Sequence, residues 1–150
     1  TVGTGKSVQW PVGVGGKGNS GVAGVVKNTE GAIGYLNYGY VNGGKFQQVA
    51  LQNRAGNFVK ANSETSAAGL AKIVLDDKLR GADPNPAGAN AYPIVSLTWI
   101  LAYPESAPGV KETLRYMLSE KSQGISDSLG YVPLPESLRQ KSLAAVDSIK

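Results

Sequence analysis

Apolar and polar residues alternate with two different periods along this chain, and the two periods predict helices that alternate with strands. Helical spacing of three and four residues follows start signals at Asn19 or Ser20, at Asn62 or Ser63, at Pro108 and at Pro135. Short apolar runs typical of strands occupy residues 7–12, 46–51, 58–61 and 94–101, and the tyrosine-rich run at 32–41 predicts a strand that continues into a turn of helix. Strands that alternate with helices indicate an α/β fold built in layers.

Turn residues divide this pattern. Residues 42–44 predict a turn before the run at 46–51, which we expect to pair with residues 58–61 as a small hairpin. The run at 94–101 is rich in β-branched and large apolar residues, which is typical of a strand buried on both faces of a parallel sheet. Two prolines and two glycines at 81–88 predict a surface loop or a lobe boundary.

The apolar spacing also predicts which face of each later helix is buried and where one of these helices ends. After the second cap, Ala67, Leu70, Ala71 and Val74 should share one face, and after Pro108 the buried face should hold Val110, Leu114, Met117 and Leu118. Gly124 should end the helix that begins near Pro108. The last helix should place Leu138, Ser142, Ala145 and Ile149 on one side.

A glycine-rich run at residues 10–23, closed by residues 31–35, predicts a strand, a turn, a short helix, a turn and a strand. Such a loop can present bare backbone N–H groups to an anion, or it can let two elements pack very closely. The candidate anion-binding residues are Gly16, Lys17, Gly18, Asn19 and Ser20. Sequence physics leaves both uses of the loop open.

Two other glycine patterns resemble nucleotide sites and are rejected on context. Residues 3–7 end like a phosphate-binding loop, but a strand is predicted after them where that loop needs a helix. Residues 13–18 satisfy the dinucleotide fingerprint, but the expected acidic residue about twenty positions later is missing. We therefore expect no cofactor and read residues 3–7 as a turn before a strand.

Composition removes several classes of function. The 150 residues include no cysteine and no histidine, which excludes disulfides, thiol nucleophiles, imidazole bases and Cys/His zinc sites. The acids lie singly apart from Asp76 and Asp77, so we expect neither a metal site nor an enzyme. The net charge of +4 comes from scattered lysines and arginines, and aromatics make up 7%, which argues against a nucleic-acid face. No apolar run approaches the roughly 20 residues of a membrane span.

The sequence of residues 10–41 resembles the middle of the phosphate-binding proteins that serve ABC-type phosphate importers. This segment reads WPVGVGGKGNSGVAGVVKNTEGAIGYLNYGYV. The similarity continues through residues 91–101 and 131–135. Those proteins are periplasmic or secreted type II solute-binding proteins with two α/β lobes joined at a hinge. The resemblance implies a type II periplasmic-binding-protein-like α/β fold, with residues 1–90 as the later part of lobe two and residues 91–150 as the C-terminal return to lobe one.

The resemblance also implies a function: a receptor that binds inorganic phosphate and delivers it to the permease of an ABC transporter. In the family, much of the phosphate shell comes from an Arg-Ser-Asp-Gly-Ser-Gly-Thr type segment and from the first lobe. Neither has a counterpart here, and both would precede Thr1. We therefore expect this chain alone to bind phosphate weakly or not at all.

Because 150 residues are too few for two lobes, we expect exposed apolar faces that a further segment or a second copy would cover. The chain begins with threonine, which we read as removal of upstream sequence. Two alternative functions stay open. One is a stand-alone structural or binding module that kept the fold without phosphate binding. The other is an enzyme that acts on phosphorylated substrates through Lys17 and the loop amides.

Overall fold

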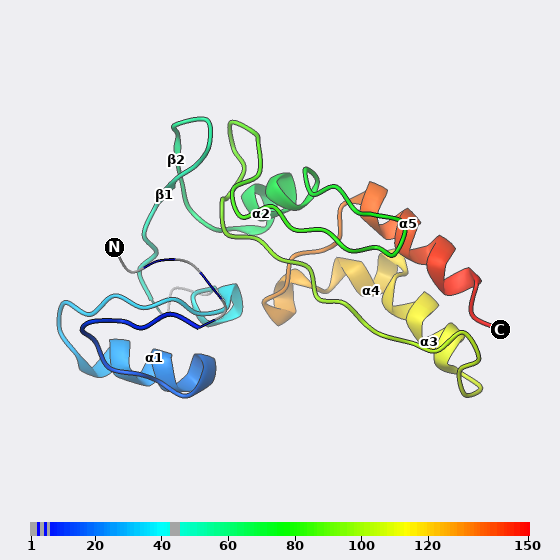
Figure 1. Ribbon diagram of the computed structural model, residues 1–150, viewed down its shortest axis with the longest axis horizontal. Coiled ribbons are helices and arrows are strands. Elements are labelled where there is room, and N and C mark those ends of the chain that lie inside the picture. The colour runs from blue at the N-terminus through cyan, green and yellow to red at the C-terminus, as the bar shows by residue number, and fades with distance from the viewer. Residues whose placement is uncertain (1–2, 4, 6, 43–45) are drawn as a thin grey trace.

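The computed structural model describes residues 3, 5, 7–42 and 46–150. In chain order the elements are α1 (Gly18–Asn28), η1 (Tyr38–Tyr40), β1 (Leu51–Gln52), β2 (Phe58–Val59), α2 (Ser63–Leu70), α3 (Val110–Met117), α4 (Glu120–Gly124), η2 (Asp127–Leu129) and α5 (Glu136–Asp147). Figure 1 shows α1 with its flanking segments at one end, and α3 and α5 at the other. Long extended segments connect these helices.

Helix α1 forms where the valine spacing predicts it, but Lys17 rather than Asn19 or Ser20 is the N-cap residue. The side chains of Asn19 and Ser20 instead hold the segment that returns alongside the helix. The backbone N–H of Asn37 donates to Asn19 Oδ1 at 2.9 Å, and the hydroxyls of Ser20 and Tyr40 are hydrogen-bonded at 2.8 Å. The predicted cap was wrong because tertiary contacts use both side chains.

The predicted hairpin is confirmed. Strands β1 and β2 pair antiparallel, with Leu51 opposite Val59. The turn between them contains Asn53, whose backbone N–H donates to the carbonyl of Asn57 at 2.9 Å. In the described part of the chain, this two-stranded hairpin is the β-sheet.

Helix α2 starts at the predicted cap. Asn62 Oδ1 accepts from the backbone N–H of Thr65 at 2.8 Å, and Thr65 Oγ1 accepts from the N–H of Asn62 at 3.1 Å, which satisfies two amides of the first turn reciprocally. The helix ends at Leu70, earlier than the apolar spacing predicts. Val74 therefore lies outside the helix and is 85% exposed, while Ile73 takes the buried position.

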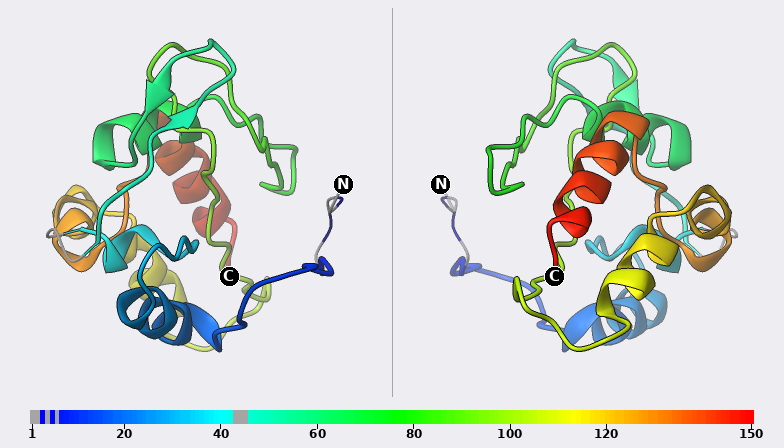
Figure 2. Two further views of the ribbon diagram at one scale, coloured as in Figure 1. Left: turned by 90° about the vertical axis from the view of Figure 1, so that its left-hand side faces the viewer. Right: turned by 90° about the vertical axis from the view of Figure 1, so that its right-hand side faces the viewer.

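The core lies between α2, α5 and the segment at 94–101. Leu70, Ile73 and Leu138 are buried together, and partly buried side chains pack against them: Leu75, Val95, Leu97 and Val132. Val146 and Ile149 are buried as well. The predicted inner side of the last helix is therefore confirmed at Leu138, while Ile149 is buried just beyond the end of α5. Figure 2 shows α1 on the opposite side of the molecule from the β1–β2 hairpin.

Two helices, α3 and α4, occupy the stretch where one helix was predicted. Ser119 breaks the stretch because its backbone is extended and its side chain accepts from the N–H of Ser122 at 3.2 Å, which starts α4. The predicted inner face is half-buried at Val110, Leu114 and Leu118, whereas Met117 is exposed.

Charged side chains tie the last helices to their neighbours. Lys111 Nζ donates to the carbonyl oxygens of Asp147 and Ile149, and Arg115 pairs with the carboxylate of Asp147 at 2.7 Å. These contacts hold α3 against the C-terminal end of α5.

Arg139 plays the same part at the start of α5. It is buried, pairs with Glu136 at 2.8 Å and donates to the carbonyl of Leu118 at 3.2 Å. The hydrogen-bonded guanidinium holds the pKa of Glu136 below its usual value.

The remaining predicted strands are extended but do not pair. Within the described ranges, the backbone of residues 7–12, 46–50 and 94–101 makes no hydrogen bond to another backbone segment. The expectation that 94–101 is buried on both faces was also wrong: Ile94 is 69% and Ile100 57% exposed. A strand needs a neighbour to satisfy its amides and carbonyls, and the described part of this chain does not supply one. Residues 43 and 44 of the turn predicted at 42–44 lie outside the described residues.

Candidate anion-binding site

Residues 16–20, which we call the candidate loop, comprise the end of the glycine-rich loop and the first residues of α1. Gly18 adopts a positive φ of 64°, and no acceptor for the amides of Gly18, Asn19 and Ser20 is present in the part of the chain that the structure describes. These are the orphan N–H groups of the first helical turn, and they lack a side-chain cap. The helix start thus has the amides and the partial positive charge that attract an anion.

The five candidate residues contribute unequally. Lys17 is exposed and forms no ion pair with any described residue, so its ammonium group is available beside the amides. The side chains of Asn19 and Ser20 are already hydrogen-bonded to the returning segment. The arrangement therefore leaves Lys17 and the backbone amides as the donors that could hold an oxyanion.

The glycines of this run differ in whether they pack closely against the helix or leave space for an anion, the two uses that the sequence left open. A Cβ atom on Gly16 would lie 2.4 Å from the backbone nitrogen of Val22, so the loop and the helix touch there backbone to backbone. A Cβ on Gly15 or Gly18 would meet nothing within 4 Å. Gly16 thus serves close packing, while the space beside Gly18 is open.

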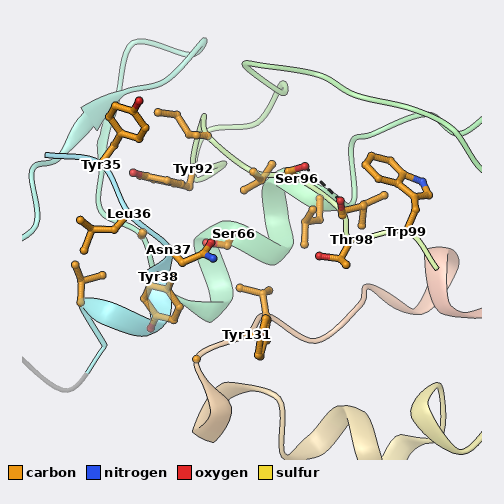
Figure 3. Close-up of a pocket in the computed structure, with 18 of the residues that line it drawn as sticks. Tyr35, Leu36, Asn37, Tyr38, Ser66, Tyr92, Ser96, Thr98, Trp99 and Tyr131 are labelled. Carbon is orange, nitrogen blue, oxygen red and sulfur yellow. Dashed lines mark hydrogen bonds between the residues drawn. The ribbon is translucent and has the colours of Figure 1, made fainter. Parts of the chain in front are cut away.

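A large hollow opens between the α1 end and the core, and several tyrosines project into it (Figure 3). It measures about 2120 Å³, and no charged residue lines it among those that the structure describes. Small-molecule sites enclose roughly 300–1,000 Å³ and place a few polar groups precisely. A hollow this large and uncharged has the character of an uncovered core rather than of an anion pocket.

The tyrosines around this hollow are a feature that sequence reasoning missed as a cluster, although residues 32–41 are visibly tyrosine-rich. Tyr35, Tyr38, Tyr92 and Tyr131 come from segments far apart in the chain (Figure 3). Burial raises the pKa of Tyr92, and burial together with the nearby Asp127 carboxylate raises the pKa of Tyr38. The hydroxyls of Tyr38 and Tyr92 therefore stay protonated and neutral at physiological pH.

The carboxylates of Asp76 and Asp127 have structural partners. Hydrogen bonds from Arg80 lower the pKa of Asp76, whose carboxylate also accepts from the N–H of Lys78 at 2.9 Å. The Ser63 hydroxyl donates to the Asp127 carboxylate. No group of three or more acidic side chains is placed to hold a metal ion in the described ranges. Among the described helices, none has the length and apolarity to cross a membrane.

Residues 3–121 match the family described as the PBP superfamily domain, and the chain belongs to this superfamily. This match confirms the predicted α/β, type II periplasmic-binding-protein-like fold class; the packed helices and the small sheet are consistent with a partial α/β lobe. The family resemblance inferred from residues 10–41 is confirmed as well.

Similar proteins carry the printed name of phosphate-binding protein PstS. The protein from Methanocaldococcus jannaschii is 34% identical, and the match covers 99% of this chain and 44% of the relative. The protein from Pasteurella multocida is 34% identical, with 94% and 43% covered, and one from Xylella fastidiosa is 38% identical, with 91% and 39% covered. All three are named as binding proteins. The chain spans less than half the length of these relatives.

Proposed function

We propose that this chain is part of a periplasmic or secreted receptor that binds inorganic phosphate and delivers it to an ABC transporter permease. The observation that carries this proposal is similarity to phosphate-binding proteins along 91–99% of the chain. The relatives' names point in the same direction.

Within this proposal, polypeptide outside Thr1–Lys150 completes the phosphate site. The hollow has no charged lining, and the candidate loop offers Lys17 and three amides. A phosphate with several oxygens needs more donors than that when it is removed from water. The division of residues 1–90 and 91–150 between two lobes is part of the same proposal.

A second candidate function, a structural module that kept the fold without an anion site, is favoured by one observation. Gly16 is pressed against Gly21 and Val22, as expected where glycines serve packing alone. The open amides of Gly18 and Asn19 favour the receptor instead. The two functions therefore predict different effects of the Lys17 charge: it should strengthen phosphate binding in a receptor and should bind no anion in a structural module.

Calorimetric titration with inorganic phosphate tests the proposal. The chain alone should show no tight stoichiometric uptake, because most of the donors are missing. A chimera in which Thr1–Lys150 replaces the matching part of the Methanocaldococcus jannaschii relative should bind phosphate. Tight phosphate binding by the chain alone would contradict the proposal that polypeptide outside Thr1–Lys150 completes the site. A folded chimera that binds no phosphate would contradict the proposed receptor function.

The same chimera tests the candidate loop. Lys17→Ala should weaken phosphate binding about two- to fivefold, as expected for one exposed cation at a helix start. Lys27→Ala is the matched control, because Lys27 is an exposed lysine in the last turn of the same helix. Equal affinities of the two variants would assign the loop to packing and place the phosphate contacts elsewhere in the chimera.

A further inference from the structure

Residues 76–80, which we call the Asp76 loop, close around the carboxylate of Asp76. Its Oδ1 accepts from the backbone N–H groups of Lys78 at 2.9 Å and of Arg80 at 2.8 Å, and its Oδ2 accepts from Nε of Arg80 at 2.9 Å. The backbone of Asp76 is paired as well, because its N–H donates to the carbonyl of Arg80 and its carbonyl accepts from the N–H of Leu79, both at 2.9 Å. One residue thus closes the whole loop.

Leu79 has a strained backbone within this loop. Its φ of 58° makes it the one residue other than glycine with a positive φ among those that the structure describes. This left-handed conformation is unfavourable for a bulky residue, because the Cβ atom comes too close to the following carbonyl oxygen. Leu79 keeps it because hydrogen bonds to the Asp76 carboxylate fix the residues on both sides. The loop therefore holds a strain that depends on Asp76.

The strained residue contacts the extended segment at 94–101. Nε1 of Trp99 donates to the carbonyl oxygen of Leu79 at 2.7 Å (Figure 3). In the described part of the chain, this is the hydrogen bond that joins residues 94–101 to another segment, since the bond donated by Ser96 stays within the segment. The indole is 44% exposed, so burial alone does not hold it in place. The Asp76 loop thus supplies the polar attachment of residues 94–101.

Arg80 is the charged side chain that faces the Asp76 carboxylate. Its hydrogen bond lowers the pKa of Asp76, and the N–H groups of Arg80 and Lys78 lower that pKa further. Trp99, which contacts the loop from the neighbouring segment, is uncharged, and Asp76 has no second ionic partner among the described residues. A carboxyl whose pKa is lowered by folding contributes stability above the unfolded value of about 3.9, and the contribution is lost as the pH falls through the folded pKa.

We propose that the Asp76 loop is a pH-sensitive latch on the segment at 94–101. While the carboxylate is ionised, it holds Leu79 in the left-handed conformation and presents the Leu79 carbonyl to Trp99. When acid protonates the carboxylate, the strain at Leu79 is no longer balanced, so the loop relaxes and Trp99 is released. The apolar contacts of Val95 and Leu97 with the core then remain as the attachment of the segment. This conformational device does not depend on phosphate binding.

The indole N–H of Trp99 reports the state of the latch directly. Proton–nitrogen correlation NMR at successive pH values follows this signal, and Trp10 is replaced by phenylalanine so that a single indole remains. We expect the Trp99 signal to shift as the pH falls below about 4, while the helix content from circular dichroism is unchanged at that pH. A loss of helix content at the same pH would show global acid unfolding and would overturn the proposal.

Asp76→Asn keeps an oxygen acceptor for the two backbone amides and removes the charge. At pH 7 the indole hydrogen of Trp99 should exchange with solvent about tenfold faster in this variant, because a neutral acceptor bonds a guanidinium about half as strongly as a carboxylate does. The shift below pH 4 should disappear. Asp77→Asn is the matched control, since Asp77 is an exposed neighbouring carboxylate without a hydrogen bond to a described residue, and it should change neither result.

Leu79→Gly separates the strain from simple support of the loop. Glycine adopts a positive φ without strain and keeps the carbonyl that Trp99 contacts, so the midpoint of the Trp99 transition should fall by at least about one pH unit. The double variant with Asp76→Asn should regain slow exchange of the indole hydrogen at pH 7. A merely structural role of the loop predicts the reverse, because loss of the half-buried leucine side chain would weaken the contact further.

Any one of three results in these variants would contradict the latch. The first is a Trp99 transition that survives in Asp76→Asn. The second is an equal effect of Asp76→Asn and Asp77→Asn on indole exchange. The third is a midpoint that stays the same or rises in Leu79→Gly.

Discussion

Replacement of Asn53 by aspartate should lower the free energy of unfolding by more than about 3 kcal/mol. Asn53 is 4% exposed and connects the β1–β2 turn to the loop at 85–91. Its Nδ2 donates to the carbonyl oxygens of Gly88, Ala89 and Ala91 at 3.2, 2.9 and 3.1 Å, and its Oδ1 accepts from the N–H groups of Ala55 and Asn57, both at 3.0 Å. A carboxylate can replace the acceptor but not the donor.

The destabilisation should depend on pH. In Asn53→Asp the new carboxylate would face three carbonyl oxygens without a hydrogen to share, so its folded-state pKa lies above the unfolded value of about 3.9. A carboxyl whose pKa is raised by folding contributes stability below the unfolded pKa and loses it as the pH rises through the folded pKa. The variant should therefore recover part of its stability as the pH falls from 7 toward 4, which is the reverse of ordinary acid denaturation.

Urea unfolding followed by circular dichroism at pH 7 and pH 4 measures both effects. Asn90→Asp is the matched control, because Asn90 is exposed in the neighbouring loop and its side chain has no hydrogen bond to a described residue. It should stay within about 0.5 kcal/mol of the unsubstituted protein. Equal losses at the two positions would show that the Asn53 hydrogen bonds do not hold the loop.

Local sequence signals predicted those parts of the fold whose cause lies within a few residues. The cap at Asn62, the hairpin between β1 and β2 and the start of α5 after Pro135 all depend on neighbours in sequence. The Asn53 contacts join residues 35 to 38 positions apart, and nothing near Asn53 in the sequence encodes them. Such tertiary contacts become visible only when the chain is folded.

The misjudged strand at 94–101 has a different cause. Its apolar residues suit a central position in a complete sheet, where a strand is buried on both faces. The pattern therefore predicted burial on both faces. The described residues supply one covering face, through Val95 and Leu97, and no neighbouring strand. Hydrophobic pattern thus predicts the surroundings that a segment requires, whether or not those surroundings are part of the same chain.

The candidate loop shows a similar limit of sequence reasoning. Glycine has no side chain that could indicate whether its small size serves a ligand or a packed neighbour. The structure separates the residues of one run, because Gly16 touches the backbone of Val22 while Gly15 and Gly18 face open space. The loop therefore packs closely at Gly16 and leaves open space beside Gly15 and Gly18.

Gly16→Ala should destabilise the α1 end by about 1–3 kcal/mol, the usual effect of forcing an extra carbon into a packed contact. The added Cβ would lie 2.4 Å from the Val22 nitrogen and 2.5 Å from the Gly21 carbonyl carbon, and neither backbone atom can move without shifting the first turn of the helix. Neither Gly15 nor Gly16 has a positive φ, so backbone strain does not contribute to the difference between them.

Gly15→Ala is the matched control, since a Cβ there meets nothing within 4 Å and should leave stability nearly unchanged. Hydrogen exchange at Val25 and Val26 reports the opening of α1 in both variants, and faster exchange is expected in Gly16→Ala alone. Equal exchange rates would contradict the packing role of Gly16. In the phosphate-binding chimera, weaker binding by Gly16→Ala with unchanged exchange at α1 would instead assign this glycine to the anion, because a lost approach to the ligand leaves the helix contact intact.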